Sequence, residues 1–521
     1  MKRPVIATVL AVLLLTACTP KDGPGPIDPA GATRAPAPPT VAPPVEGPDP
    51  SYSIAAFYYP WYGNPTSNGR WIHWNDPNFA PPQQIASDLY PQLGAYSSDD
   101  PLVVAQHMAW LRRAGVGVII SSWWGRDTHE DQVVPLLLST AQRYGIKVAF
   151  HLEPYGGRSA ERLVDDIKYL YQRYGSSPAF FRSTASTRFS PGSHPKGVFF
   201  VWCVESAVQT CGKQPATAAY WRPALDAIHA LPGGGALVIG NTEQAAFVRD
   251  GHFDGLYNYL TLHPDRDGGF DWARELPPGS LYVPSVMPGS SAVRVGYPSD
   301  TLVAREGGQI YDDQWGAALG TSIRPDLVTI TSFNEWHEGT AIEPAAVGVT
   351  DGQGHAYADF GPLPADGYLA RTRQWVADYL ASSFPTTHRV RIRVRTTSDW
   401  TNVDVVSGGR VLRPDRISVT SGATRGDLEG LSRFVLTQPL GKAVVGTSVE
   451  MIYDVLLSGL DPNGKLELSI QRGDIGGTRV DIYNYLGSTP VSVGTISWTG
   501  IKFGQKSFGG SVLSSTLLKP L

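Results

Sequence analysis

The stretch VGVIISSWWGRDTHEDQVVPLLLSTAQRYGIKVAFHLE, residues 116–153, decides the fold class. Val116–Trp123 and Lys147–Glu153 are short runs rich in β-branched and aromatic residues, a composition typical of strands. Asp131–Tyr144, between them, has the apolar spacing of an amphipathic helix. A strand, a helix and a second strand in this order predict two parallel strands joined by a helical crossover, the unit from which α/β folds are built.

The same alternation runs from Ser51 to about Phe384. Eight strands that alternate with helices predict an α/β protein with a (β/α)8 TIM barrel over residues 51–384. A doubly wound sheet is the alternative, and it is disfavoured because no glycine-rich phosphate-binding turn follows the first strand. The other predicted strands are Ser53–Tyr59, Val198–Cys203, Ala236–Gly240, Gly255–Tyr259, Leu281–Val286 and Leu327–Phe333, and the other predicted helices include Pro101–Ala114, Ala160–Tyr174, Thr301–Gly320 and Asp366–Ala381.

The pattern changes after Pro385. Residues 390–395 alternate valine or isoleucine with arginine, and this period of two indicates a half-buried strand. The arginines are interpreted as a solvated strand face rather than a contact for an acidic glycan. We expect a C-terminal all-β, β-sandwich-like accessory domain over residues 385–521. Further strand-like runs are Arg416–Thr420, Phe434–Thr437, Val449–Leu457, Leu466–Gln471, Val480–Tyr485 and Val491–Trp498.

The N-terminus has the features of an export signal. Two basic residues precede the apolar run Val5–Leu15, which is too short to span a bilayer but has the length of a signal-peptide core. Leu15-Thr16-Ala17-Cys18 resembles the bacterial lipoprotein box, which implies a signal peptide over residues 1–17 and lipidation of Cys18. The expectation is an exported protein that is lipid-anchored to the cell membrane and faces outside the cytoplasm. A plain secretory signal with an incidental cysteine is the alternative.

Residues 18–50 form a linker rich in proline, alanine and glycine, which we expect to act as a semi-extended tether between the lipid and the barrel. Cys203 and Cys211 are the other two of the three cysteines. In an oxidising compartment, two thiols this close in sequence are expected to form a disulfide. Two buried thiols are the alternative.

Charge and composition exclude some partners. The 521 residues include 43 Lys and Arg against 47 Asp and Glu, so the net charge of -4 offers no basic surface for a phosphate backbone, and no nucleic-acid partner is expected. With 42% hydrophobic and 17% charged residues, wholesale disorder is excluded. The 14 Trp and 23 Tyr are typical of a protein that handles carbohydrate outside the cell.

Reactive side chains gather where the predicted strands end. In a parallel barrel the carboxyl ends of the strands form the active-site face. Flat aromatic rings, with carboxylate and amide groups beside them, complement the apolar faces and the hydroxyls of a sugar, although any single ring is also explained by packing. The candidate catalytic residues are Glu335 and Glu338, and the candidate substrate-binding residues are Glu153, Tyr59, Trp61, His73, Trp74, Trp123, His151, Tyr155, Tyr257, Tyr259, Asn334, Trp336 and His337.

The Glu335 and Glu338 carboxylates lie three residues apart directly after the last strand, so a helical turn would bring them together. Proximity separates the pKa values of two carboxyl groups, and leaves one acid and one base near neutral pH. No metal ion or other cofactor is expected, because His73, His151 and His337 do not have zinc-ligand spacing. A serine hydrolase is disfavoured because no Gly-x-Ser-x-Gly motif follows a strand.

Five motifs together resemble glycoside hydrolase family 99, the endo-α-1,2-mannosidases and endo-α-1,2-mannanases. They occur in order along the predicted barrel, and the resemblance does not cover residues 385–521. The motifs are AFYYPWYGNP (56–65), WIHW (71–74), YPQLGAYSS (90–98), AFHLEPY (149–155) and TSFNEWHEGT (331–340).

The resemblance implies a retaining, endo-acting hydrolase of an α-linked, mannan-like oligo- or polysaccharide, with a 1,2-anhydro sugar intermediate. It implies that Glu335 deprotonates the sugar 2-hydroxyl, that Glu338 is the acid and then the base, and that Glu153 binds hydroxyls next to the cleaved bond. Either Tyr257 or Tyr259 would face the sugar.

Residues 123–126, WWGR, depart from the animal members of the family, which leaves glucose or mannose open in the non-reducing subsite. The alternatives are a related barrel hydrolase of another α-glycan, such as a cell-envelope polysaccharide, and a non-catalytic glycan-binding lipoprotein.

Overall fold

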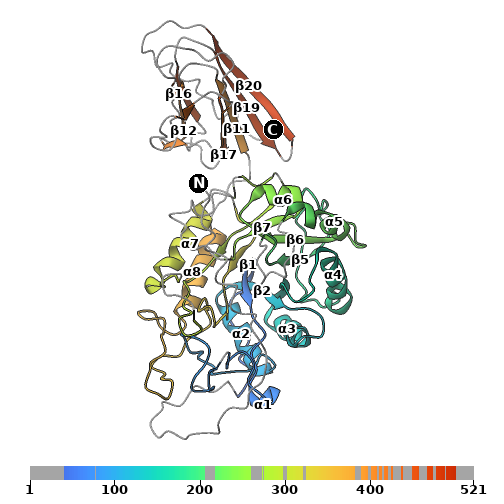
Figure 1. The fold of residues 1–521 in the computed structure, drawn as a ribbon, viewed down its shortest axis with the longest axis vertical. Coiled ribbons are helices and arrows are strands. Elements are labelled where there is room, and N and C mark those ends of the chain that lie inside the picture. The colour runs from blue at the N-terminus through green and yellow to red at the C-terminus, as the bar shows by residue number, and fades with distance from the viewer. Residues whose placement is uncertain are drawn as a thin grey trace. The chain divides into compact units, whose positions relative to one another are not determined.

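The computed structural model divides the chain into two compact units (Figure 1). The first comprises Met1–Gly320 and Pro325–Ser382, and the second comprises Thr321–Arg324 and Ser383–Leu521. Within residues 40–381, the structure describes all but residue 77 and residues 206–216, 260–272, 274, 278, 297–301 and 321–323; beyond residue 388 it describes only the strands. Cys18 and Cys211 lie outside the described residues, so lipidation and the Cys203–Cys211 disulfide stay predictions.

Eight strand positions close into a parallel barrel in the first unit. Hydrogen-bonded neighbours follow the order β8-β7-β6-β5-β3-β2-β1-β10-β9. Only Pro284 separates β8 from β9, and these two pieces pair with β7 and β10 respectively, so one interrupted strand closes the ring. The strands are β1 Ser51–Tyr58, β2 Val116–Trp123, β3 Lys147–Leu152, β5 Lys196–Val201, β6 Ala236–Asn241, β7 Gly255–Tyr257, β8 Leu281–Val283, β9 Ser285–Val286 and β10 Val328–Ile330, with the short β4 Arg182–Ser183 antiparallel to β5.

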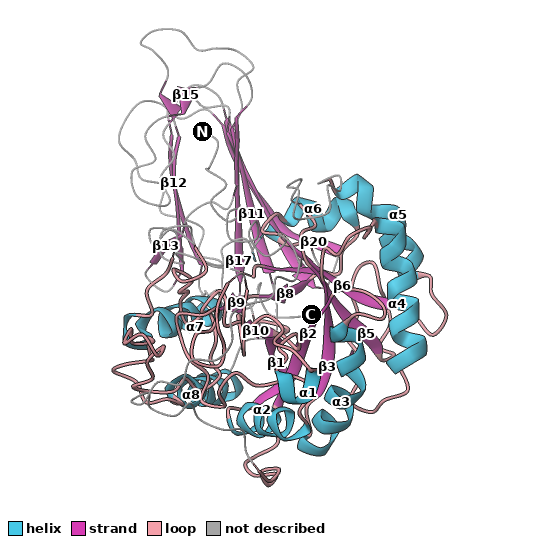
Figure 2. Cartoon of the chain, turned by 60° about the horizontal axis from the view of Figure 1, so that its bottom comes forward, coloured by secondary structure: helices cyan, strands magenta, loops and turns pink. Residues whose placement is uncertain are grey.

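Helices surround these strands (Figure 2). The α3 helix illustrates how the sequence delimits them: the Thr128 side chain accepts from the Asp131 N–H at the start, and Gly145 ends the helix with a left-handed φ of 70°. The helices are α1 Pro65–Asn68, α2 Pro101–Arg113, α3 His129–Tyr144, α4 Ala160–Tyr174, α5 Ala218–His229, α6 Ala245–Gly251, α7 Gln309–Gly320 and α8 Gly367–Ala381, with a 3-10 turn at Glu306–Gly308 before α7.

The predicted (β/α)8 barrel is therefore confirmed. All eight residues of β2 are buried, which fits a strand covered on both faces. The bounds differ in detail: the predicted strand Leu281–Val286 is interrupted at Pro284, and the predicted helix Thr301–Gly320 begins only at Gln309. Proline has no N–H to donate, which explains the interruption.

Two long connections cover the carboxyl end of the barrel. Residues 59–100 join β1 to α2, and residues 331–366 join β10 to α8. Because β1 and β10 are neighbours in the barrel, with Ala56 paired to Ile330, these connections begin side by side. They carry most of the candidate site residues.

Strands are the only regular secondary structure among the described residues of the second unit. The largest sheet has five strands in the order β14-β17-β11-β19-β20, and the other sheets have three and two strands, all antiparallel. Period-two alternation correctly predicted β11, while β12, β13 and β15 were not predicted. The strands are β11 Arg389–Thr396, β12 Thr401–Ser407, β13 Arg410–Leu412, β14 Arg416–Val419, β15 Thr424–Arg425, β16 Leu436–Thr437, β17 Val449–Leu456, β18 Leu466–Arg472, β19 Gly477–Leu486 and β20 Thr489–Thr499.

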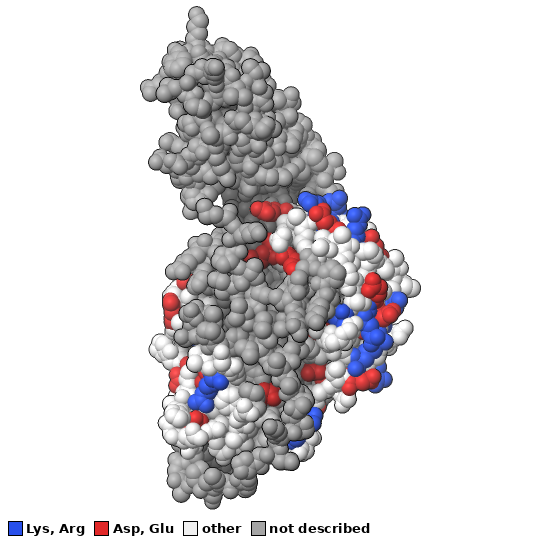
Figure 3. Space-filling model, viewed as in Figure 1, with Lys and Arg blue, Asp and Glu red and all other residues white. Residues whose placement is uncertain are grey.

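On the face in view, acidic and basic side chains are interspersed over the described surface (Figure 3). Within the described part of the chain, no helix has both the length and the apolar character needed to cross a bilayer.

Candidate active site

The loop that follows β10 closes on itself. The N–H of Ser332 donates to the Thr340 carbonyl at 3.0 Å, and the N–H of Glu343 donates to the Phe333 carbonyl at 2.8 Å. Inside the loop, the Ser332 hydroxyl accepts from the N–H of Glu335 at 2.8 Å. These bonds hold residues 332–343, which we call the carboxylate loop, in a single shape that carries both Glu335 and Glu338.

Glu335 is 1% exposed, and its two oxygens have different surroundings. Oε1 accepts from the backbone N–H groups of His337 at 3.0 Å and Glu338 at 3.3 Å. Oε2 has no hydrogen-bond partner among the described residues. Burial, and then the Glu338 charge, raise the pKa of Glu335, while the two backbone N–H groups oppose that rise. A buried carboxylate with one free oxygen is suited to accept a proton from a bound ligand.

Glu338 is 8% exposed and accepts a hydrogen bond from the Tyr259 hydroxyl at 3.2 Å. The Tyr59 hydroxyl lies 2.5 Å from that of Tyr259, so the end of β1 and the segment after β7 meet at this carboxyl group. Burial raises the pKa of Glu338 to about 7; the Tyr259 hydrogen bond opposes this rise, and the Glu153 charge adds to it. Since each carboxylate hinders ionisation of the other, an intermediate pH range leaves one acid and one base.

Glu153 follows β3 and is buried beside His151. Its Oε1 accepts from the Ser122 hydroxyl at 2.9 Å and lies 2.9 Å from Nδ1 of His151. The other ring nitrogen of His151 lies 2.6 Å from the Tyr257 hydroxyl. The two candidate tyrosines are thereby distinguished: Tyr259 reaches Glu338, whereas Tyr257 supports His151 below the site.

A group of aromatic rings lies beside the carboxylate loop. The Trp61 ring stacks on the His73 ring, with centroids 4.8 Å apart, and lies 4.7 Å from the Tyr59 ring. Nε2 of His337 donates to the His73 carbonyl at 2.8 Å. Burial, and then His73, lower the pKa of His337 to about 4, so His337 is neutral and this nitrogen carries its proton. These contacts bring Trp61, His73 and His337 together next to Glu338.

The two tryptophans at the end of β2, Trp123 in the strand and Trp124 directly after it, point in opposite directions. The Trp123 indole is fully buried and donates to Asp131 of α3 at 2.8 Å, on the helical side of the barrel. The Trp124 indole donates to the Ser122 hydroxyl at 3.1 Å, and its ring centroid lies 6.5 Å from that of Trp61. Trp124, which was not among the candidates, therefore lies with the site residues, while Trp123 lies outside them.

Four other candidates support the site from below or beside it. The Tyr155 hydroxyl donates to Asp166. Oδ1 of Asn334 accepts from the N–H of Tyr59 at 2.7 Å and its Nδ2 donates to the Tyr59 carbonyl at 3.0 Å, which ties the end of β1 to the carboxylate loop. The indoles of Trp74 and Trp336 are buried, and each donates to Tyr96, Trp74 to the carbonyl and Trp336 to the hydroxyl.

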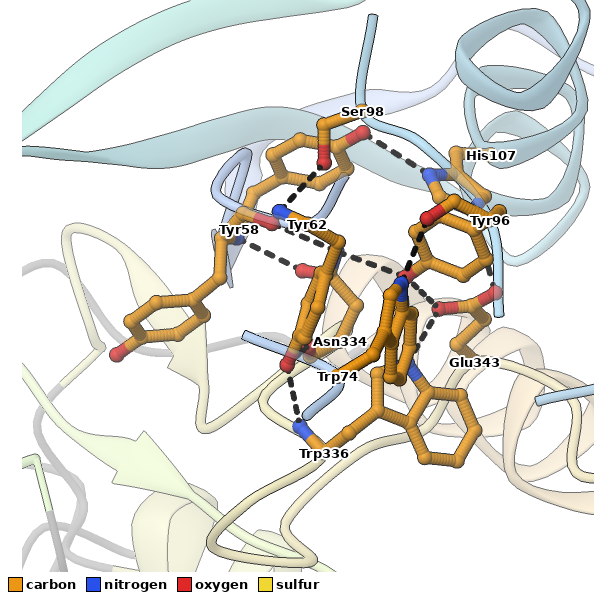
Figure 4. A network of polar contacts seen from close by, with 10 residues as sticks. Tyr58, Tyr62, Trp74, Tyr96, Ser98, His107, Asn334, Trp336 and Glu343 are labelled. Atoms are coloured by element: carbon orange, nitrogen blue, oxygen red, sulfur yellow. Dashed lines mark hydrogen bonds and ion pairs between the residues drawn. The ribbon is translucent and has the colours of Figure 1, made fainter. Parts of the chain in front are cut away.

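Figure 4 shows a buried polar network that includes Asn334, Trp336 and Glu343 of the carboxylate loop. At its centre the Glu343 carboxylate accepts from Tyr96 and Trp336 and lies 3.2 Å from His107 of α2. The sequence analysis did not find Glu343 or His107, because 236 residues separate them and neither belongs to a chemical motif. Among the described residues, no cluster of three or more His, Cys, Asp or Glu side chains has the arrangement of a metal site.

Comparisons with known proteins match the first unit. A mouse protein named glycoprotein endo-alpha-1,2-mannosidase is 33% identical over 384 residues, which cover 66% of this chain and 79% of that protein. A zebrafish glycoprotein endo-alpha-1,2-mannosidase-like protein is 35% identical over 374 residues, 64% of this chain and 80% of that protein. The GH99 endo-alpha-mannosidase from Bacteroides thetaiotaomicron superimposes with a TM-score of 0.54 at 32% identity and covers 64% of this chain and 98% of that structure. The family model of glycosyl hydrolase family 99 matches residues 50–381, and the chain therefore belongs to that family of glycoside hydrolases.

Proposed function

We propose that this protein is a retaining, endo-acting glycoside hydrolase that cleaves internal α-mannosidic bonds of the α-1,2 type. The observation that carries the proposal is the carboxylate loop, which holds two buried carboxyl groups: Glu335 has one oxygen without a partner among the described residues, and burial raises the pKa of Glu338 to about 7. A pKa near neutrality suits a group that first donates a proton and then removes one. The similarity to endo-mannosidases supports the choice of substrate.

In the proposed first step, Glu335 removes the proton of the sugar 2-hydroxyl and the oxygen attacks C1. The bond between C1 and the leaving oxygen breaks, and that oxygen takes the proton of Glu338. The product at this stage is a 1,2-anhydro sugar. An α-mannoside holds its 2-oxygen on the ring face opposite to the leaving group, as this attack requires, whereas an α-glucoside does not.

In the proposed second step, the Glu338 carboxylate removes a proton from water and the water oxygen bonds to C1. The bond between C1 and the 2-oxygen breaks, and the 2-oxygen regains the proton that Glu335 holds. Two inversions at C1 give net retention. Glu153 binds hydroxyls of the sugar next to the cleaved bond, and Trp61 and Trp124 supply flat apolar surfaces.

Product analysis on a panel of α-linked polymers tests the proposal. We expect oligosaccharide products of retained configuration from α-1,2-linked mannan, and no cleavage of a 2-deoxy or 2-fluoro analogue, which lacks the internal nucleophile. Preferential cleavage of another α-glycan would favour the related-hydrolase alternative. Absence of turnover on every polymer would favour the alternative of a non-catalytic glycan-binding protein.

We also propose that the protein is exported and anchored through a lipid on Cys18, with residues 18–50 as a tether and residues 385–521 as an accessory domain. The sequence of residues 1–18 supports this proposal. Cell fractionation tests it: wild type should sediment with membranes and Cys18→Ala should not. Sedimentation of both proteins with membranes would contradict lipid anchoring at Cys18.

A further inference from the structure

Glu343 is fully buried and yet makes no direct contact with either Glu335 or Glu338 among the contacts of the described residues. It ends the carboxylate loop, where its N–H donates to the Phe333 carbonyl. Its side chain lies among Tyr96, His107 and the Trp336 indole (Figure 4). Burial of a carboxylate away from water costs free energy unless several hydrogen-bond donors satisfy it. The donors around Glu343 therefore indicate which parts of the structure this carboxylate stabilises.

Two donors converge on one oxygen of Glu343. Oε2 accepts from the Tyr96 hydroxyl at 2.8 Å and from the Trp336 indole at 3.0 Å. Burial, and then the Glu343 charge, raise the pKa of Tyr96, so its hydroxyl keeps the proton that it donates. Hydrogen bonds to a charged acceptor are about twice as strong as neutral ones.

The other oxygen of Glu343 contacts a residue outside the carboxylate loop. Oε1 lies 3.2 Å from Nε2 of His107, and Nδ1 of His107 lies 2.9 Å from the Tyr58 hydroxyl. A carboxylate accepts only, so Nε2, the ring nitrogen that faces Glu343, carries a proton. The network thus joins Trp336 to α2 and to β1, two elements of the barrel itself.

Trp336 is one of the two residues, with His337, that lie between the proposed catalytic pair Glu335 and Glu338. Its N–H donates to the Tyr62 hydroxyl at 3.1 Å and its carbonyl accepts from the Ser87 hydroxyl at 2.8 Å. The indole, held by Glu343, is the third anchor. A residue anchored at three points between Glu335 and Glu338 restricts movement of the backbone that carries the two carboxyl groups.

We infer that Glu343 is a positioning residue for hydrolysis, which acts through Trp336 to hold Glu335 and Glu338 at their working separation. The inference rests on the proposed function, because it takes these two residues as the catalytic pair. A misplacement of about 1 Å can cost roughly 10²-fold in rate. Loss of the anchor should therefore lower kcat, while substrate contacts elsewhere keep KM nearly unchanged.

The test compares Glu343→Leu, Glu343→Gln and Trp336→Phe in the full chain on α-1,2-linked mannan oligosaccharide. Leucine removes the carboxylate that accepts from Trp336 and Tyr96, and it leaves the Trp336 indole with the Tyr96 hydroxyl at 3.2 Å as an acceptor. Phenylalanine removes the indole donor. Glutamine keeps one acceptor oxygen for these two donors and can donate its amide to His107 in the other tautomer. We expect Glu343→Leu and Trp336→Phe to lower kcat about 10- to 100-fold with KM within about threefold, and Glu343→Gln to recover most of the loss.

Asp254 provides the matched control. It is also a fully buried carboxylate with a histidine partner: its Oδ2 lies 3.0 Å from Nε2 of His229 and accepts from the N–H of Val238 at 2.8 Å. Those partners belong to β6 and α5, away from the carboxylate loop. Asp254→Leu should lower Tm as Glu343→Leu does, with kcat of the folded protein close to wild type.

Two results would overturn the inference. One is an unchanged kcat in Trp336→Phe and in folded Glu343→Leu. The other is an equal loss of kcat in Asp254→Leu, which would reduce the role of Glu343 to general stability. If Glu343→Leu does not fold, Trp336→Phe still decides. Failure of the proposed function is distinguishable, because Glu335→Gln and Glu338→Gln would then remain active.

Discussion

The Tyr259 hydroxyl donates to Oε2 of Glu338 at 3.2 Å, and so joins the segment after β7 to the carboxylate loop after β10. This bond favours the ionised form of Glu338 and opposes the pKa rise that burial causes. The contact therefore tunes the proposed acid of the first step.

Tyr259→Phe removes that bond, so the pKa of Glu338 should rise further. The acid form then persists to higher pH, and the alkaline limb of the kcat/KM profile should move to higher pH, with an activity loss of about tenfold. Tyr174→Phe is the control. The Tyr174 hydroxyl donates to Oδ1 of Asp131 at 2.9 Å, and this hydrogen bond lies outside the site. An alkaline limb that stays in place or moves to lower pH would contradict the assignment of Glu338 as the acid.

Gly339→Ala should damage both stability and catalysis. Gly339 has a φ of +61°, and a Cβ there would lie 2.1 Å from the Ser291 carbonyl oxygen, while the Ser291 N–H donates to the Glu338 carbonyl. Clash and backbone strain together should cost about 2–5 kcal/mol, and movement of Glu338 should lower kcat about 10²-fold.

Gly348→Ala isolates the effect of backbone strain. Gly348 also has a left-handed φ, of +71°, but no atom of the described residues lies within 4 Å of the added Cβ. This variant should lose about 1–2 kcal/mol by thermal or urea unfolding and keep wild-type kcat. Equal behaviour of the two alanine variants would refute a specific role for close packing at Gly339.

Trp123→Ala and Trp124→Ala should separate stability from binding. Trp123 is buried and bonds Asp131, so its truncation should cost about 3–5 kcal/mol of unfolding free energy. Trp124 lies beside Trp61, so its truncation should raise KM about tenfold with Tm close to wild type. A wild-type KM in Trp124→Ala would remove this ring from the substrate site.

The barrel could be predicted because its strands are hydrophobic runs of ordinary length and its helices have clear apolar periodicity. Strand ends also located Glu153, Glu335 and Glu338 correctly at one face, since parallel strands share their direction. The direction of each side chain was harder to predict. Trp123 and Trp124 are adjacent and identical in type, and a register shift of one residue exchanges their faces.

The supporting network could not be predicted for a different reason. Tyr58, His107 and Glu343 come from β1, α2 and the loop after β10, and only the closed barrel brings them together. The sequence around each of these residues does not indicate which distant residues it will contact. A fully buried glutamate nevertheless indicates a polar network once its burial is known.

The central claim is that Glu335 is the base toward the 2-hydroxyl and Glu338 the acid, and leaving-group dependence tests it most directly. The measurement is kcat/KM of wild type, Glu335→Gln and Glu338→Gln on a mannan oligosaccharide and on a matched glycoside with a good leaving group. Each variant should lose at least about 10²-fold on the oligosaccharide. A good leaving group needs little protonation, so the first step of Glu338→Gln should be partly restored and that of Glu335→Gln should not. The account would be contradicted if the activated substrate restored the kcat/KM of Glu335→Gln. It would also be contradicted if Glu335→Gln kept most of its activity on the oligosaccharide.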